Sequence, residues 1–436
     1  MKSKLNSQVN KFERRIGGNY HSVPGTYEGE TGEDMQLIDD GDTCGAEELE
    51  SLFQVKCRIG NELAVSLNSD YILHLAADSC FTRVAAGLSN AVVHIFDVNV
   101  ERAFQISSVA SVSTSTPDER VGICGVRFLD DTPNCLLVGE NSGIIRLYDL
   151  RTQREQARFE ENIEHTDNFS YNGRGSSMNI RKAINCFDSN SNGRIICTGT
   201  EQYQGDSFLL FYDVRQREHL GGYFESHEDD ITSLRFHDKN PDILCSGSTD
   251  GLINVFDIKE ETEDDALTAT INVECSIQKL NWHKNIYEQD VISCVTDTND
   301  FHVYFAEEGD VVAKFDRCQI TAAAKRKNED NCIVVGAHSN GNGDLLLLTG
   351  TNNKGEVLRI LRLNNNLLPV ADLIGNRQIV RTSVFDQKSG TLVTGGESGF
   401  VTLWTTEGSR KEDGGLTSSS SEFKYKNKKS KKKTPY

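Results

Sequence analysis

The sequence predicts an all-β fold built from seven similar units, and three observations support this prediction. A sequence motif made of small residues, an apolar run and an aromatic residue recurs along the chain, most clearly at residues 246–257 (SGSTDGLINVFD). Its copies end near residues 97, 149, 213, 257, 305, 361 and 404, at spacings of 43 to 64 residues. One further strand-like stretch, residues 52–59, precedes the first unit and belongs to none of them. Repeats of this length bury their apolar faces only by stacking on neighbours.

Each well-formed unit is expected to hold four short strands. In the fourth unit, apolar alternation predicts strands at residues 231–236, 243–246, 252–256 and 267–271. The shortest spacings between units match the ~40–45 residues of a four-stranded propeller blade, and the longer ones are expected to contain insertions. The largest insertion, residues 151–182, has a polar, turn-rich centre, which favours a specific contact surface.

The N-terminal strand offers a way to close the ring. After Trp404 no further unit fits, and the seventh unit lacks a fourth strand. A linear stack would expose two sheet edges, which invite aggregation, whereas a ring protects its edges. We therefore expect residues 52–59 to complete the last blade of a seven-bladed β-propeller that spans residues 51–408. A loose N-terminal strand is the alternative.

Both ends of the chain differ from the repeats in composition. Residues 1–50 show no apolar period, and residues 21–50 hold ten Asp and Glu and no Lys or Arg, which predicts a disordered acidic segment. Residues 409–436 turn to Gly and Ser and then to Lys, which predicts a disordered tail. The acidic stretches 28–50 and 260–265 could contact basic proteins, and simple solvated charge is the alternative.

Composition and motif spacing exclude several classes of function. The 436 residues carry a formal net charge of −19, which argues against broad nucleic-acid binding. The 12 cysteines form no C-x-x-C pair, and no H-E-x-x-H, G-x-S-x-G or P-loop spacing occurs. We therefore expect a non-enzymatic protein with no cofactor and no metal. The sequence has neither an apolar signal segment nor an apolar run of 18 residues, so we expect a reducing compartment, the nucleus, the cytoplasm or both.

Two smaller motifs have ordinary structural interpretations. Residues 188–193 match the first half of an EF-hand calcium loop, but Gly199 stands where the bidentate Glu is required. An Asn/Gly hairpin turn between two strands is the better interpretation. The basic cluster at residues 325–327 is expected to lie in a surface turn.

The units resemble WD repeats in specific residues. In the fourth unit, His227, Ser246 and Asp250 occupy the positions of that family's buried hydrogen-bond chain. The last member of the chain is usually Trp, but here it is Phe256, which has no donor, so we expect a truncated network. Trp404 keeps the indole in the last unit. The resemblance implies a WD-repeat propeller that mediates protein–protein interactions.

A narrower resemblance rests on the fourth unit and its surroundings. Residues 226–258, the acidic stretch 260–267 and the GTNNKG segment at 350–355 together resemble the family of WD repeat-containing protein 89. This resemblance implies a scaffold of the nucleus or the cytoplasm that has no catalytic activity. Because a closed propeller has no intrinsic need to pair, we expect a monomeric propeller that binds other proteins within a complex.

Two consecutive units end in Tyr-Asp-x-Arg boxes. Their members are Tyr148, Asp149 and Arg151, followed by Tyr212, Asp213 and Arg215. The boxes resemble the W-D-x-R box of propellers that serve as substrate receptors of cullin-4 ubiquitin ligases, whose Arg docks on the ligase adaptor. Arginine suits such a contact because its guanidinium makes several directed hydrogen bonds. The competing interpretation is that each Arg caps its own turn or pairs with an acidic neighbour.

The C-terminal tail carries a dense cluster of lysines. They are Lys426, Lys428, Lys429, Lys431, Lys432 and Lys433. Such runs serve as nuclear-import signals or nucleic-acid patches, and we expect import here, with a solvated tail as the alternative. A phosphate on residues 418–421 would add roughly −1.5 to −2 charge beside the lysines and is expected to weaken import.

Overall fold

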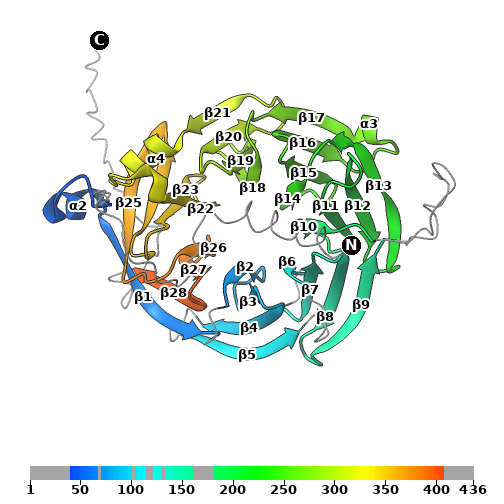
Figure 1. Ribbon diagram of the computed structural model, residues 1–436, viewed down its shortest axis with the longest axis horizontal. Helices are drawn as coiled ribbons and strands as arrows, with labels where there is room; N and C mark the ends of the chain where they lie inside the picture. The colour runs from blue at the N-terminus through cyan, green and yellow to red at the C-terminus, as the bar shows by residue number, and fades with distance from the viewer. Residues whose placement is uncertain are drawn as a thin grey trace, which may run out of the picture. The chain divides into compact units, whose positions relative to one another are not determined.

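The structure is a computed structural model that describes residues 40–66, 70–99, 105–113, 121–129, 133–161 and 181–406. Its strands form five four-stranded sheets and one eight-stranded sheet, arranged around a ring (Figure 1). The predicted all-β propeller is therefore confirmed. None of the helices in the described residues is long and apolar enough to cross a membrane. The predicted acidic segment up to residue 39 and the predicted tail from residue 409 lie outside the described residues.

Each four-stranded sheet is a meander whose first strand lies innermost in the ring (Figure 1). The first two sheets are β2 (Ile72–Ala77), β3 (Arg83–Leu88), β4 (Val92–Asn99) and β5 (Gln105–Ser113), then β6 (Ile123–Phe128), β7 (Cys135–Glu140), β8 (Ile144–Asp149) and β9 (Arg154–Glu160). The next two are β10 (Ile184–Ser189), β11 (Ile195–Thr200), β12 (Ser207–Asp213) and β13 (Glu218–His227), then β14 (Ile231–Phe236), β15 (Ile243–Ser248), β16 (Leu252–Asp257) and β17 (Leu267–Asn272). The fifth is β18 (Ile277–Lys284), β19 (Asp290–Thr296), β20 (Phe301–Phe305) and β21 (Val311–Phe315).

The eight-stranded sheet contains the end of the described chain and one strand from its beginning. Its order is β22 (Cys332–Ser339), β23 (Leu345–Thr351), β24 (Leu358–Asn364), β25 (Asn366–Ile374), β1 (Val55–Ala64), β28 (Phe400–Thr406), β27 (Thr391–Gly396) and β26 (Val380–Asp386). The helical elements are α2 (Ala46–Leu52), α3 (Glu263–Ala266), α4 (Arg317–Ala323) and the short 3-10 helix η2 (Glu329–Asn331). All seven copies of the recurring motif end within the third strand of a meander. These strands are β4, β8, β12, β16, β20, β24 and β28.

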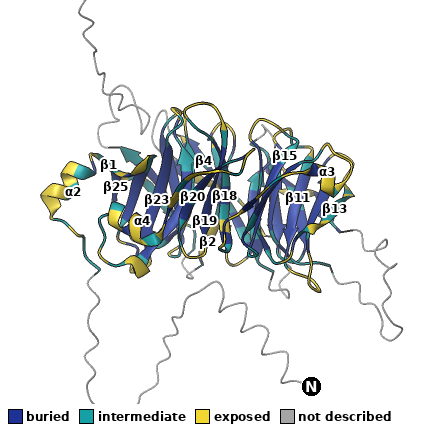
Figure 2. Ribbon diagram, turned by 90° about the horizontal axis from the view of Figure 1, so that it is seen from above, coloured by how far each residue is buried: buried dark blue, intermediate teal, exposed yellow. Residues whose placement is uncertain are grey.

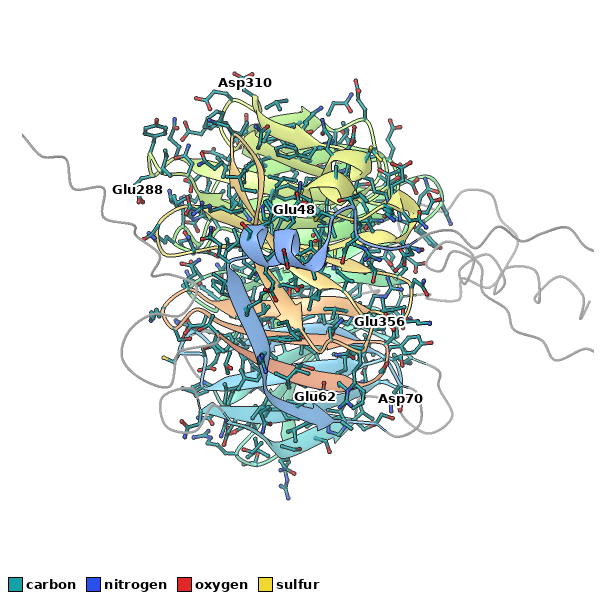
Figure 3. All side chains as sticks on the ribbon, turned by 90° about the vertical axis from the view of Figure 1, so that its left-hand side faces the viewer. Glu48, Glu62, Asp70, Glu288, Asp310 and Glu356 are labelled. Carbon is teal, nitrogen blue, oxygen red and sulfur yellow. The ribbon has the colours of Figure 1, made fainter. Side chains whose placement is uncertain are left out.

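Strand β1 closes the ring. It pairs antiparallel with β28 from Cys57 to Ala64, so the predicted pairing of residues 52–59 with the last unit is confirmed, although the strand runs further along the chain. It also pairs parallel with β25 from Val55 to Arg58, which the repeat pattern does not predict. Figure 3 shows β1, which carries the labelled Glu62, running beside these strands below α2. A segment from the start of the chain thus ties the last two meanders together.

The glycine of the recurring motif has a packing role. A Cβ on Gly247 of β15 would lie 2.7 Å from Ile277 Cγ2 on the next inner strand, and one on Gly199 would lie 2.4 Å from Ile231 Cγ2. The same contact joins the last unit to the first, because a Cβ on Gly395 would lie 2.5 Å from Ile72 Cγ2. Real Cβ atoms do not approach so closely, so a small residue is needed where one sheet packs on the next.

The hydrogen-bond chain of the fourth unit is formed as expected. His227 Nδ1 lies 2.9 Å from Asp250 Oδ2, and His227 Nε2 lies 2.7 Å from Ser246 Oγ. The carboxylate selects the tautomer in which Nδ1 donates, so the Ser246 hydroxyl donates to Nε2. Phe256 is fully buried and has no polar atom to extend the chain, which confirms the truncated network. In the last unit, Trp404 Nε1 donates to Thr394 Oγ1 at 2.9 Å.

The N-terminal segment corrects two expectations. Residues 40–50 belong to the stretch predicted to be disordered, yet Asp42 accepts hydrogen bonds from Arg326 at 3.0 Å and from Arg359 at 2.7 and 3.1 Å. Helix α2 follows, and Phe53 after it is fully buried. Arg326 is therefore not part of a surface turn, since only 9% of its side chain is exposed and two carboxylates neutralise its charge. Paired charges are the ones that a protein tolerates out of water.

Candidate protein-interaction site

Two kinds of turn lie on each face of the ring. Because successive strands of a meander are antiparallel, the turns after first and third strands share one face, and the other connections share the opposite face. Figure 3 shows this arrangement edge-on: Glu288, from a turn after a first strand, points away on one side, and Asp70 and Glu356 lie on the other. Exposed residues gather in these turns, whereas the strands are mostly buried (Figure 2). Both Tyr-Asp-x-Arg boxes end third strands and so lie on the face of Glu288.

The first box is held together by its own charges. Arg151 Nε and Nη2 donate to the two oxygens of Asp149 at 3.0 and 2.8 Å, and the backbone N–H of Arg151 donates to the same carboxylate at 2.9 Å. These hydrogen bonds lower the pKa of Asp149 to about 2. Tyr148 is buried in the sheet, and burial raises the pKa of its hydroxyl. The Arg151 side chain is 69% exposed, but its guanidinium is already paired.

The second box has the same backbone shape but a different ion pair. Asp213 accepts the backbone N–H groups of Arg215 and Gln216, both at 2.8 Å, and the side chain of Arg194 at 3.4 Å. These contacts hold the pKa of Asp213 below its usual range, with the Gln216 N–H as the main cause and burial opposing it. Tyr212 is buried, and its pKa is raised by that burial. Arg215 is exposed, and its guanidinium has no partner within the part of the chain that the structure describes.

The two boxes therefore differ in what they offer a partner. Arg151 follows the competing interpretation, in which the arginine pairs with its acidic neighbour. Arg215 presents an unpaired guanidinium beside an Asp213 that another arginine already neutralises. Both boxes remain predictions as binding sites.

A turn that the sequence analysis did not single out lies on the same face. Ile286 and Tyr287, between β18 and β19, are 66% and 76% exposed. Asn285 Oδ1 accepts the N–H groups of Tyr287 and Gln289 at 2.8 and 3.0 Å, which fixes the shape of this turn. The available signal was an apolar pair inside a polar turn, K-N-I-Y-E-Q. Exposed large apolar side chains on a rigid turn are typical of binding surfaces.

The remaining predicted motifs take up structural positions or fall outside the described residues. Residues 188–193 cover the end of β10 and the hairpin turn that leads to β11, where the N–H of Gly193 donates to the carbonyl of Asn190 at 2.9 Å. Across residues 40–406, excluding the gaps named above, no group of three His, Cys, Asp or Glu side chains is placed to hold a metal ion. The insertion at 151–182 contributes β9, and its residues 162–180 lie outside the described part, as does the lysine cluster 426–433.

The acidic stretch 260–265 is partly used inside the fold. Glu263 of α3 accepts hydrogen bonds from the N–H groups of Phe224 and Glu225 and from the Ser226 hydroxyl. This carboxylate is neither simple solvated charge nor free to bind a basic partner. It anchors α3 to β13 of the preceding sheet, at the outer rim of the ring (Figure 1).

Comparison with known proteins agrees with this architecture. The WD domain, G-beta repeat family matches residues 219–257, which cover β13 of one sheet and β14 to β16 of the next. The repeat is therefore offset by one strand from the sheet, and the same offset leaves the last sheet to be completed by β1.

Similar proteins cover different shares of the chain. An uncharacterized WD repeat-containing protein of Saccharomyces cerevisiae is 33% identical over 176 residues, which are 34% of this chain and 44% of that protein. The WD repeat-containing protein 89 homolog of Dictyostelium discoideum is 24% identical over 364 residues, 76% of this chain and 95% of that one. The DDB1- and CUL4-associated factor 11 homolog of Caenorhabditis elegans is 34% identical over 77 residues, 18% of this chain and 13% of that one.

Proposed function

We propose that this WD-repeat propeller protein is a non-enzymatic scaffold that binds other proteins through the turns on the Glu288 face of its ring. We count the eight-stranded sheet as two blades that β1 joins, so that the ring has seven blades. The observation that carries the proposal is the exposure of Ile286 and Tyr287, 66% and 76%, on a turn whose backbone is fixed by hydrogen bonds. Aromatic residues on a preorganised turn are favoured anchors of protein interfaces, because little conformational entropy is lost on binding.

The matching experiment compares two double variants with the wild-type protein. Ile286→Ser/Tyr287→Ser removes the apolar pair of the proposed face. Val311→Ser/Val312→Ser is the control, because these residues are 52% and 40% exposed on the outer strand β21. Tagged full-length proteins are purified from cells, and co-purifying proteins are quantified by mass spectrometry. The proposal predicts that the first variant loses a set of partners that the control retains; identical partner sets for all three proteins would contradict it.

A second candidate function is substrate receptor of a cullin-4 ubiquitin ligase. Two observations favour it: the unpaired, exposed Arg215, and the similarity of part of the chain to a DDB1- and CUL4-associated factor 11 homolog. In this function, Arg215 and Arg151 would dock on the ligase adaptor. Because Arg151 is paired with Asp149, we expect Arg215→Ala to weaken adaptor binding more than Arg151→Ala. Co-purification of the adaptor with the wild type and its loss from the double variant would support this function, and its absence from the wild type would exclude it.

We also propose that the protein resides in the nucleus, the cytoplasm or both, with the lysine cluster 426–433 acting in nuclear import. A fluorescent fusion in which the six lysines are replaced by Gln should shift toward the cytoplasm. An unchanged distribution would leave the cluster as a solvated tail.

A further inference from the structure

The inner strands bring several cationic side chains together around the ring axis. Arg127 of β6, Arg235 of β14 and Lys279 of β18 come from three of the strands that lie innermost in Figure 1. Arg127 and Arg235 have the same register in their sheets, two residues along the inner strand from the Lys279 position. Lys279 Nζ donates to the carbonyls of Val335 and Arg381, on β22 and β26, at 2.7 and 2.9 Å. One lysine therefore reaches the inner strands of two other units.

Two carboxylates offset these cations in part, because the charges of Asp188 and Asp238 both interact with that of Arg235. Asp188 of β10 is the carboxylate that pairs with Arg127, at 2.9 Å. Its second oxygen accepts the N–H of Phe236 at 2.9 Å, and its charge also raises the pKa of Arg235, against the stronger effects of burial and of Arg127. The guanidinium of Arg235 donates to the carbonyl of Leu234 at 2.8 Å, and no carboxylate in the described part of the chain forms an ion pair with it.

The electrostatic consequences are visible in neighbouring groups. Burial, together with the charge of Arg127, lowers the pKa of Arg235 to about 10. Burial also lowers the pKa of Lys279 to about 8, and the charges of Arg381 and Arg235 add to the effect. His74 of β2 lies in the same field, since burial and the charges of Arg127, Lys279 and Arg235 lower its pKa to about 4. Burial and like charges outweigh the nearby carboxylate at Arg235, and buried cations that lack an ion pair of their own cost stability, a cost that is typical of binding sites.

We propose that the ring axis is a binding site for a phosphoryl group, held by Arg235 and Lys279 with Arg127 beside them. Arginine guanidinium groups bind phosphate through paired N–H donors, and lysine adds a compact charge. The net charge of the whole chain is −19, so an anion is repelled by the protein as a whole and needs a local cationic site to bind. This inference is independent of the proposed scaffold function. The phosphoryl group could belong to a free polyphosphate or to a phosphorylated protein.

Thermal unfolding with tripolyphosphate as the probe tests the site. The Tm of the wild type should rise with the logarithm of probe concentration, compared with chloride at equal ionic strength. Arg235→Gln should abolish this rise and should leave the Tm of the unliganded protein equal or higher, because a buried cation without an ion pair of its own is removed. Arg154→Gln, at an exposed position on β9, is the matched control and should behave as the wild type. Lys279→Gln repeats the test at the second cation if Arg235→Gln does not fold.

Two comparisons interpret the result. The first distinguishes binding at the ring axis from a general effect of ions, and the second distinguishes a free polyphosphate from a phosphorylated protein. No rise in the wild type, or an equal rise in Arg235→Gln and the wild type, would overturn the proposal. A serine-phosphorylated peptide and its unphosphorylated form are titrated in parallel by calorimetry. Binding of tripolyphosphate alone supports a free polyphosphate as ligand, and binding that depends on the peptide phosphate supports a phosphorylated protein.

Discussion

Replacing Phe53 by alanine measures how far the N-terminal segment belongs to the core of the ring. Phe53 follows α2 and precedes β1 along the chain, and its fully buried side chain packs in a cluster with residues of β20, β22, β23 and β24. Its ring also faces the guanidinium of Arg359, 4.9 Å from the ring centroid. A buried Phe→Ala change costs about 3–5 kcal/mol through lost transfer energy and the cavity that remains. The cation–π contact accounts for about 0.5–2 kcal/mol of the interaction.

Urea unfolding followed by far-UV circular dichroism gives the free energy of unfolding for this comparison. Phe224→Ala is the control, since this phenylalanine is 48% exposed and makes one edge-to-face contact with Phe208. Its loss should cost about 0.5–1.5 kcal/mol. We expect Phe53→Ala to lose at least twice as much stability as the control. Equal losses would refute the conclusion that the segment around Phe53 is an integral part of the ring.

Three further predictions concern the repeat and its closure. Gly247→Ala should destabilise the protein by about 1–3 kcal/mol in urea unfolding, because its Cβ would overlap Ile277. Gly336→Ala is the control and should be nearly neutral, because no atom lies within 4 Å of the added Cβ. Equal effects of the two variants would contradict the packing role of Gly247. Trp404→Phe should cost about 1 kcal/mol by removing one buried hydrogen bond, and no loss of Tm would count against it. For Asp42, burial opposes ionisation, but hydrogen bonds and charges from two arginines lower its pKa. This stabilisation is complete above the unfolded pKa of about 4 and is lost as pH falls through the lower folded value. Unfolding measured against pH should therefore separate wild type from Asp42→Asn at pH 7 and bring them together in acid; a constant difference would be inconsistent with the ion pair.

The propeller was predictable because its signal is local and repeated. The recurring motif covers the second and third strands of each unit. The structure shows why its glycine is needed, because Gly247, Gly199 and Gly395 each pack against an inner-strand isoleucine of the next unit. The pairing of β1 with β28 followed from the missing strand of the last unit. The same periodicity says which face of a strand is buried, but it does not name both neighbours, so the parallel pairing with β25 went unpredicted.

Long-range charge pairing explains the other features that the sequence did not predict. Asp42 binds Arg326 and Arg359, which are 284 and 317 positions away in the sequence. From composition alone, such an acidic stretch is predicted to be disordered and solvated. The difference between Arg151 and Arg215 has a similar origin. It depends on whether Asp149 or Asp213 has another arginine nearby, and Arg194 reaches Asp213 from the preceding hairpin. The cations at the ring axis come from separate units, so their convergence becomes visible only once the ring is closed.

The central claim is that partners bind through the Glu288 face, and a titration tests it most directly. The partner most depleted from the Ile286→Ser/Tyr287→Ser purification is produced on its own and titrated against wild type and both double variants by calorimetry. We expect at least a ~30-fold weaker Kd for the Ile286→Ser/Tyr287→Ser protein, which corresponds to the loss of ~2 kcal/mol that defines a hot spot. The Val311→Ser/Val312→Ser protein should match the wild type. Equal affinities for all three proteins would contradict the claim that this face is the binding surface.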